Sequence, residues 1–107
     1  IFISGTLVQQ TQGLELLDAF CVQGASDTVN IIVRNLGTSE VATSGITVTQ
    51  TQPAGPVNPT PWGAITTISS GSTATMIDEC EGSGPRICIY RIIPVAGRSL
   101  NAPVNCQ

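Results

Sequence analysis

Four cysteines, at positions 21, 80, 88 and 106, place the strongest constraint on the fold of this 107-residue chain. The chain contains no histidine, and the cysteine spacing matches no zinc or haem motif, so no metal site is predicted. An even number of cysteines in a short chain instead predicts two disulfides and an oxidising, extracytoplasmic environment. Of the three pairings that four cysteines allow, we favour Cys80–Cys88, which would close a hairpin, together with Cys21–Cys106.

The composition indicates an all-β fold. Threonine, valine and isoleucine are abundant, and their branched side chains pack well on the pleated surface of a sheet. A chain of 107 residues is long enough for one core between two layers. Because turn signals separate short apolar segments about every 8–12 residues, we predict a sandwich of two antiparallel sheets with about 7–8 strands over residues 13–107.

The first half of the predicted sandwich is defined by apolar segments between turns. Residues 13–24 are expected to form a first strand, which turns at Gly24–Asp27 into a second strand. In the second strand Val29, Ile31 and Val33 alternate with more polar residues and are expected to face the core. Residues 41–51 alternate apolar residues with threonine and predict one half-exposed strand.

A corner is expected after the second strand, at Asn35 and Gly37. The asparagine side chain can hydrogen-bond the backbone that follows it, and the glycine would supply a positive φ. Nothing nearby looks able to do chemistry. We therefore interpret this corner as a device that turns the sheet.

The proline-rich segment 52–63 predicts a surface loop outside any central ladder. It contains Trp62, the only tryptophan, which we interpret as a plug for the end of the core rather than as a ligand platform. Residues 64–80 then predict two strands broken at Ser69–Ser72.

The segment "RICIYRIIPVAG" is the strongest strand in the sequence. It is apolar on both faces, which favours a central strand or one that a partner covers. One side carries Ile87, Ile89 and Ile93, and the other carries Cys88, Tyr90 and Ile92. The closing segment "SLNAPVNC" is predicted to be an edge strand because Pro103 cannot donate a ladder hydrogen bond.

Residues 1–12 form an N-terminal extension to the predicted sandwich. The apolar segment 1–9 fits an edge strand, the end of a preceding helix, or a strand donated to the sheet of a neighbouring subunit. In the last case subunit contacts would come from its large apolar side chains, which are Ile1, Phe2, Ile3, Leu7 and Val8.

Catalysis, cofactors and several classes of partner are not expected. Histidine and lysine are both missing, so the usual general base and the amine nucleophile are lacking, and no small-molecule substrate is predicted. The acidic cluster of Asp78, Glu79 and Glu81 matches no calcium loop, and we interpret it as a solvated turn. Four scattered arginines against seven acids offer no footprint for nucleic acid or an anionic membrane.

Several stretches resemble the region where archaeal type IV pilin-like and archaellin-related proteins pass from an N-terminal helix into an immunoglobulin-like head. They are "GTLVQQTQGLELLDAFC", "VNIIVRNLGTSEV", "GITVTQ" and "ISSGSTATMIDEC". The long apolar helix of that family has no counterpart in this sequence. If the chain is complete, assembly would need another mechanism, and strand donation by residues 1–9 would supply one.

The resemblance implies a non-enzymatic subunit of an extracellular filament that self-associates, with no cofactor. Two alternatives remain open. One is the head of an archaellar stator-type protein that binds the surface layer of the cell. The other is a small secreted binding or inhibitor domain. All three interpretations place the chain at the cell surface or outside the cell.

Overall fold

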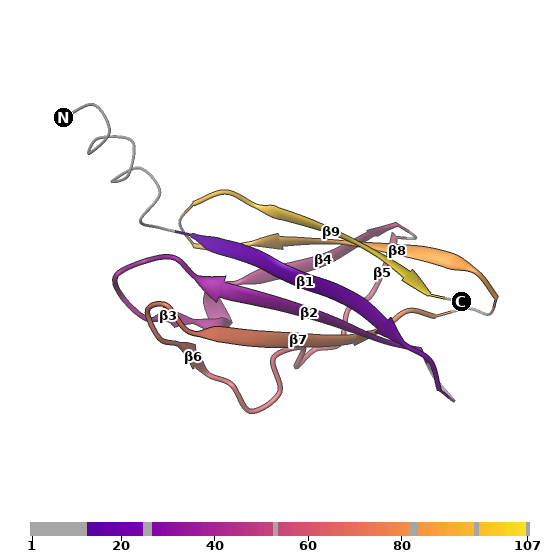
Figure 1. Ribbon diagram of the computed structural model, residues 1–107, viewed down its shortest axis with the longest axis horizontal. Coiled ribbons are helices and arrows are strands. Elements are labelled where there is room, and N and C mark those ends of the chain that lie inside the picture. The colour runs from indigo at the N-terminus through magenta and orange to yellow at the C-terminus, as the bar shows by residue number, and fades with distance from the viewer. Residues whose placement is uncertain (1–12, 25–26, 53, 82–83, 96, 107) are drawn as a thin grey trace.

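Two antiparallel sheets pack face to face in the computed structural model, which describes residues 13–24, 27–52, 54–81, 84–95 and 97–106 (Figure 1). The first sheet has the order β1-β2-β7, formed by Leu14–Val22, Thr28–Asn35 and Thr73–Glu79. The second has the order β5-β4-β8-β9, formed by Ala54–Gly55, Thr47–Gln52, Arg86–Ile93 and Leu100–Cys106. A short ladder joins β3 (Val41–Ala42) to β6 (Thr67–Ile68).

This architecture confirms the predicted all-β fold with antiparallel sheets. The strand order is consistent with the more specific immunoglobulin-like arrangement, which stays a prediction. Within the described ranges, no helix has the length and apolar character needed to cross a bilayer. The N-terminal extension 1–12 and its predicted contacts Ile1, Phe2, Ile3, Leu7 and Val8 lie outside the described residues.

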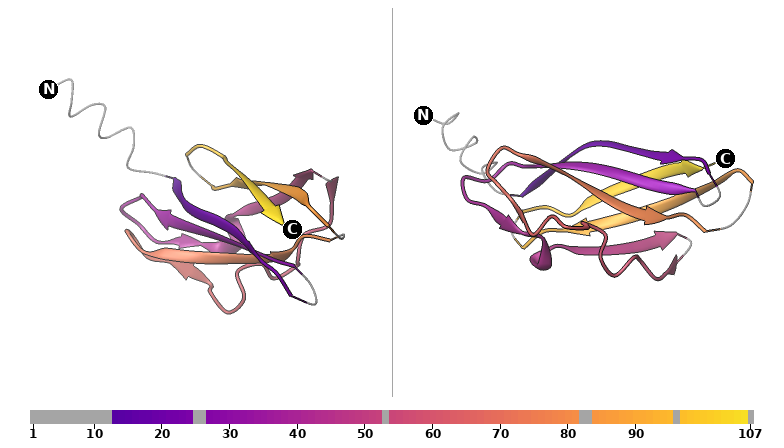
Figure 2. Two further views of the ribbon diagram at one scale, coloured as in Figure 1. Left: turned by 45° about the vertical axis from the view of Figure 1, so that its right-hand side comes forward. Right: turned by 90° about the horizontal axis from the view of Figure 1, so that it is seen from below.

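Figure 2 shows from two further directions how the two sheets face one another, and the core residues lie between them. Val29, Ile31 and Val33 of β2 are fully buried, as the alternation in the sequence predicted. From the opposite sheet, β8 contributes three inward residues, Cys88, Tyr90 and Ile92. Burying one such large apolar side chain stabilises the fold by roughly 1.5–3 kcal/mol, so these two strands anchor the molecule.

The single strand predicted over residues 41–51 is wrong, because the chain changes sheets there. A 3₁₀ turn at Thr43–Gly45 separates β3 from β4. The buried Thr43 holds this turn by donating its hydroxyl to the carbonyl of Ile65 at 2.8 Å. Gly45 lies close to Val95, because a Cβ there would lie 2.6 Å from the exposed side chain of Val95, which would have to shift. The alternation of apolar residues with threonine therefore continues in the sequence through this 3₁₀ turn, although long-range contacts bend the backbone there.

The remaining strand predictions are largely confirmed. β8 is a central strand and β9, which contains Pro103, is an edge strand of its sheet. The proline-rich segment is mostly irregular, but Ala54–Gly55 adds β5 to the edge of β4, which the sequence did not predict. Trp62 is buried in the core cluster, as its interpretation as a plug predicted, and it also lines a hollow beside β4.

Candidate functional site

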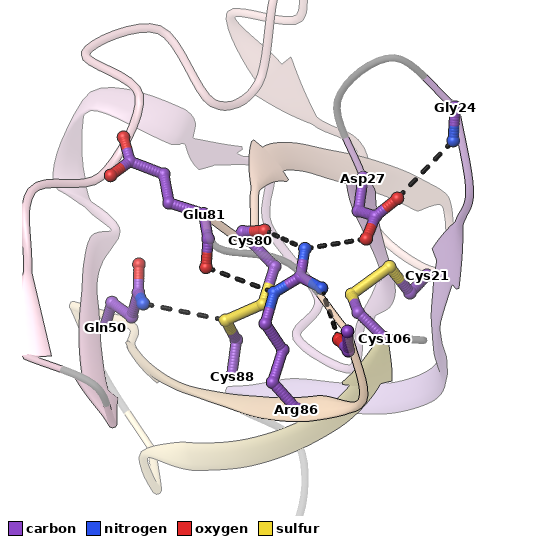
Figure 3. Close-up of polar contacts among 10 residues, drawn as sticks. Cys21, Gly24, Asp27, Gln50, Cys80, Glu81, Arg86, Cys88 and Cys106 are labelled. Atoms are coloured by element: carbon purple, nitrogen blue, oxygen red, sulfur yellow. Dashed lines mark hydrogen bonds and ion pairs between the residues drawn. A yellow bond between two sulfur atoms is a disulfide. The ribbon is translucent and has the colours of Figure 1, made fainter.

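Both disulfides lie at one end of the sandwich and connect the two sheets (Figure 3). Cys21 of β1 is bonded to Cys106 of β9 with a Cα–Cα distance of 5.4 Å. Cys80, just after β7, is bonded to Cys88 of β8 with a Cα–Cα distance of 6.0 Å. Both predicted pairings are confirmed. Two such bonds indicate that the protein folds in an oxidising environment.

Arg86 organises the loop at this end, a role that was not predicted. Its guanidinium forms a 2.6 Å ion pair with Asp27, and the two side chains are only 16% and 12% exposed. The same group donates to the backbone carbonyls of Cys80, Glu81 and Gly84 (Figure 3). A planar fork with several donors suits arginine in particular. The only available signal was its position inside a segment closed by two cysteines.

Asp78 belongs to the core and not to a solvated acidic turn, so that interpretation is wrong for this residue. Alternation along β7 points Asp78 inward, in step with Met76, whereas Glu79 and Glu81 are exposed. Its carboxylate accepts the Tyr90 hydroxyl at 2.7 Å and the Asn58 backbone N–H at 2.8 Å. Burial, this hydrogen bond and the charge of Asp78 all raise the pKa of Tyr90. The pair therefore links the two sheets while the phenol remains neutral.

Asn35 holds the end of the sandwich opposite the disulfides. The residue is fully buried, and its Nδ2 donates to the carbonyls of Ser39 and Ile68, both at 2.9 Å. Its Oδ1 accepts the N–H of Gly37 at 2.8 Å, so the predicted bond to the following backbone is confirmed. The predicted positive φ at Gly37 is wrong. The Asn35 side chain, through its bond to the N–H of Gly37, stabilises the corner for which we had expected a glycine with positive φ.

Two apolar patches lie on the outward faces of the sheets. The isoleucine stripe consists of Ile87, Ile89 and Ile93 on β8, where Ile87 is 46% and Ile93 38% exposed. The Phe20 patch, on the opposite side of the molecule, consists of Phe20, Ile32 and Ile77. Its Phe20 and Ile77 lie in register on either side of Asn30.

Threonines border the isoleucine stripe. Thr47 and Thr49 of β4 face outward and lie opposite Ile93 and Arg91 in the ladder. The face therefore carries isoleucines on either side of the exposed Arg91 along β8, and hydroxyl groups along one side. Exposed apolar residues that gather in this way mark contact surfaces more often than single exposed residues do.

The described residues offer little for catalysis or metal binding. A hollow of about 650 Å³ beside β4 is lined by uncharged residues, so it holds no acid or base. Cys21, Asp27 and Cys106 form the one group of three metal-ligating residue types found in the described ranges. Both cysteines are oxidised and Asp27 is paired with Arg86, so thiolate ligands are not present.

Comparison with known proteins gave no match to a family model, a curated protein or a solved structure. The resemblance to archaeal pilin-like heads therefore stays a prediction. The candidate functional surfaces are defined by this molecule alone, through its two outward patches and its uncharged hollow.

Proposed function

We propose that this chain is a non-catalytic structural subunit of an extracellular filament. The observation that carries the proposal is the pair of apolar patches on opposite outer faces, the isoleucine stripe and the Phe20 patch. If the patch of one subunit contacts the different patch of the next, the contact is heterologous and need not close. Repeated contacts of that kind generate open filaments.

Other features support the same function. The two inter-sheet disulfides suit a protein that persists in an oxidising environment outside the cell. Charged residues make up only 10% of the chain, so stacking subunits would require little desolvation of charge. The polar groups that the core does contain, at Asn35, Asp78 and Tyr90, are engaged in bonds that hold the fold.

Electron microscopy of the purified protein over a range of concentrations tests the proposal. We expect fibres with the natural sequence and their loss in an Ile87→Thr/Ile93→Thr variant, because its outer face is no longer apolar. Val95→Thr is the matched control, since Val95 is highly exposed but lies outside both patches. A natural protein that stays monomeric at all concentrations would contradict the filament and favour a head that docks on another surface protein.

A further inference from the structure

Part of β4 is an unpaired sheet edge. On one side β8 pairs along the strand, from Thr47 to Gln52. On the other side β5 pairs only with Gln50 and Thr51, so residues 47–49 lack a strand partner there among the described residues. Such an edge presents backbone groups that can accept another strand. The sheet could therefore be extended at this position.

The hollow of about 650 Å³ runs beside this unpaired edge and forms a groove in which apolar residues lie among threonines, prolines and Asn58. Ile46 and Trp62 are buried at the groove, and Val48 and Val57 are half-buried along it. Ile65, at 36% exposure, completes the apolar lining. In addition, the buried indole N–H of Trp62 has no acceptor in the described part of the chain. An extended segment with one apolar face would fit both the edge and the groove.

The sequence supplies such a segment at residues 1–9. It carries no charge, and in an extended conformation Ile1, Ile3 and Leu7 would share one face. Phe2, Ser4, Thr6 and Val8 would share the other face, which is therefore mixed. The face of Ile1, Ile3 and Leu7 suits strand addition, because backbone bonds supply affinity while alternate side chains fill the groove.

The groove and the start of β1 lie on opposite flanks of the sandwich. β1 is bonded to β9 through Cys21–Cys106, whereas β7 faces β8 through Cys80–Cys88. In the second sheet β4 lies on the far side of β8 from β9. The described chain begins beside Leu14 of β1 on the β9 flank, as the indigo strand and β9 in Figure 1 show. This placement favours a second copy as the source of the segment.

We propose that the β4 groove of one subunit receives residues 1–9 of a second copy of the chain. The inference rests on the proposed filament and adds a strand-addition contact to the contact between the two patches. Each subunit has one segment to donate and one groove to fill, so the contact is heterologous and continues from copy to copy.

Complementary variants of the full chain test this contact. Ile3→Asp places a charge on the apolar face of the segment, and Ile65→Arg places one in the groove. We expect each variant alone to need at least about tenfold higher concentration for assembly, which corresponds to about 1.4 kcal/mol. Mixed in equal amounts, they should form dimers, because the intact segment of Ile65→Arg enters the intact groove of Ile3→Asp. Analytical ultracentrifugation measures the species formed.

Two control variants carry the same charges elsewhere: the negative charge at the neighbouring residue of the segment, and the positive charge at an exposed residue outside the groove. Ser4→Asp alters the opposite face of the segment, and Val95→Arg alters an exposed residue outside the groove; both should assemble normally. Fluorescence of Trp62, the only tryptophan, reports that each variant is folded and that the groove is occupied.

The outcomes separate the inference from the proposed function. If the natural protein forms fibres and either charged variant forms them equally well, the groove contact is wrong and the filament stands. Monomers in the mixture would also overturn the contact, since they would mean that the segment is not exchanged between copies. If the natural protein forms no fibres, the proposed function as a filament subunit is itself wrong.

Discussion

The two ends of the sandwich are held together by different physical means. At one end two disulfides and the Arg86–Asp27 ion pair connect the sheets. At the other end the three hydrogen bonds of the Asn35 side chain hold the turns. A disulfide stabilises largely by restricting the unfolded chain, whereas Asn35 acts only in the folded state. The stability of the disulfide end therefore depends on redox conditions, whereas the stability of the Asn35 end does not.

The largest effect is expected from removing the disulfide that closes the longer loop. Cys21 and Cys106 are 85 residues apart, whereas Cys80 and Cys88 are separated by 8. Loop-closure entropy then predicts a loss of about 4.5 kcal/mol in Cys21→Ala/Cys106→Ala and about 2.5 kcal/mol in Cys80→Ala/Cys88→Ala. Urea unfolding gives both free energies. Equal losses would show that local packing, and not loop length, determines the stability of this end.

The second effect tests the opposite end. Asn35→Ala would leave the buried carbonyl of Ile68 without its donor, and we expect a loss of about 3 kcal/mol in the free energy of unfolding. Asn30→Ala is the matched control. Asn30 lies on the same strand, half-buried on the outward face, with one long bond of 3.4 Å. Its replacement should cost less than about 0.5 kcal/mol in the same urea experiment. Similar losses in both variants would mean that the corner does not depend on Asn35.

Alternation and cysteine spacing were enough to predict much of this fold. The inward set of β2, the division of β8 into two apolar sides, its central place and both disulfide pairings were predicted correctly. These features depend on local period or on a small number of pairings. The change of sheets at Thr43–Gly45 was missed because its cause, the contact with Ile65, lies 22 residues away.

The candidate site shows the same division between local and long-range features. That Ile87, Ile89 and Ile93 share one side of the strand could be predicted from the alternation, but only the packing against β2 shows that this side faces outward. The β4 groove could not be predicted, since it joins a strand edge to the loop around Trp62. Asp78 was misjudged because two neighbouring acids made it look like part of a solvated turn. Only the register of β7 turns it inward.

A smaller effect separates the buried arginine at the disulfide end from an exposed one. Lysine cannot reproduce the fork with which Arg86 reaches Asp27 and three carbonyls, so Arg86→Lys should cost about 2 kcal/mol. Arg34→Lys is the matched control. Arg34 contacts Glu15 at 3.8 Å with side chains 48% and 45% exposed, so its replacement should cost less than about 0.5 kcal/mol. Urea unfolding of both variants makes the comparison. If the Arg86→Lys protein is as stable as the natural one, the disulfide alone holds the loop.

The smallest effect comes from alkaline pH and concerns the Tyr90–Asp78 bond between the two ends. Because folding raises the pKa of Tyr90, the folded protein keeps a proton that the unfolded chain loses above about pH 10. The stabilisation is therefore complete well below pH 10 and falls as the pH rises, by about 1.4 kcal/mol at pH 11.

Tyr90 is the only tyrosine, and the chain has no lysine, so few other groups titrate in this window. Urea unfolding at pH 8 and pH 11, monitored by tyrosinate absorbance, measures the change in the free energy of unfolding. Tyr90→Phe should be less stable at pH 8, because Asp78 loses a donor, but should lack most of the further loss at pH 11. If both proteins lose the same free energy between the two pH values, the alkaline sensitivity arises outside this pair. The Tyr90–Asp78 hydrogen bond would then contribute the same stability at both pH values.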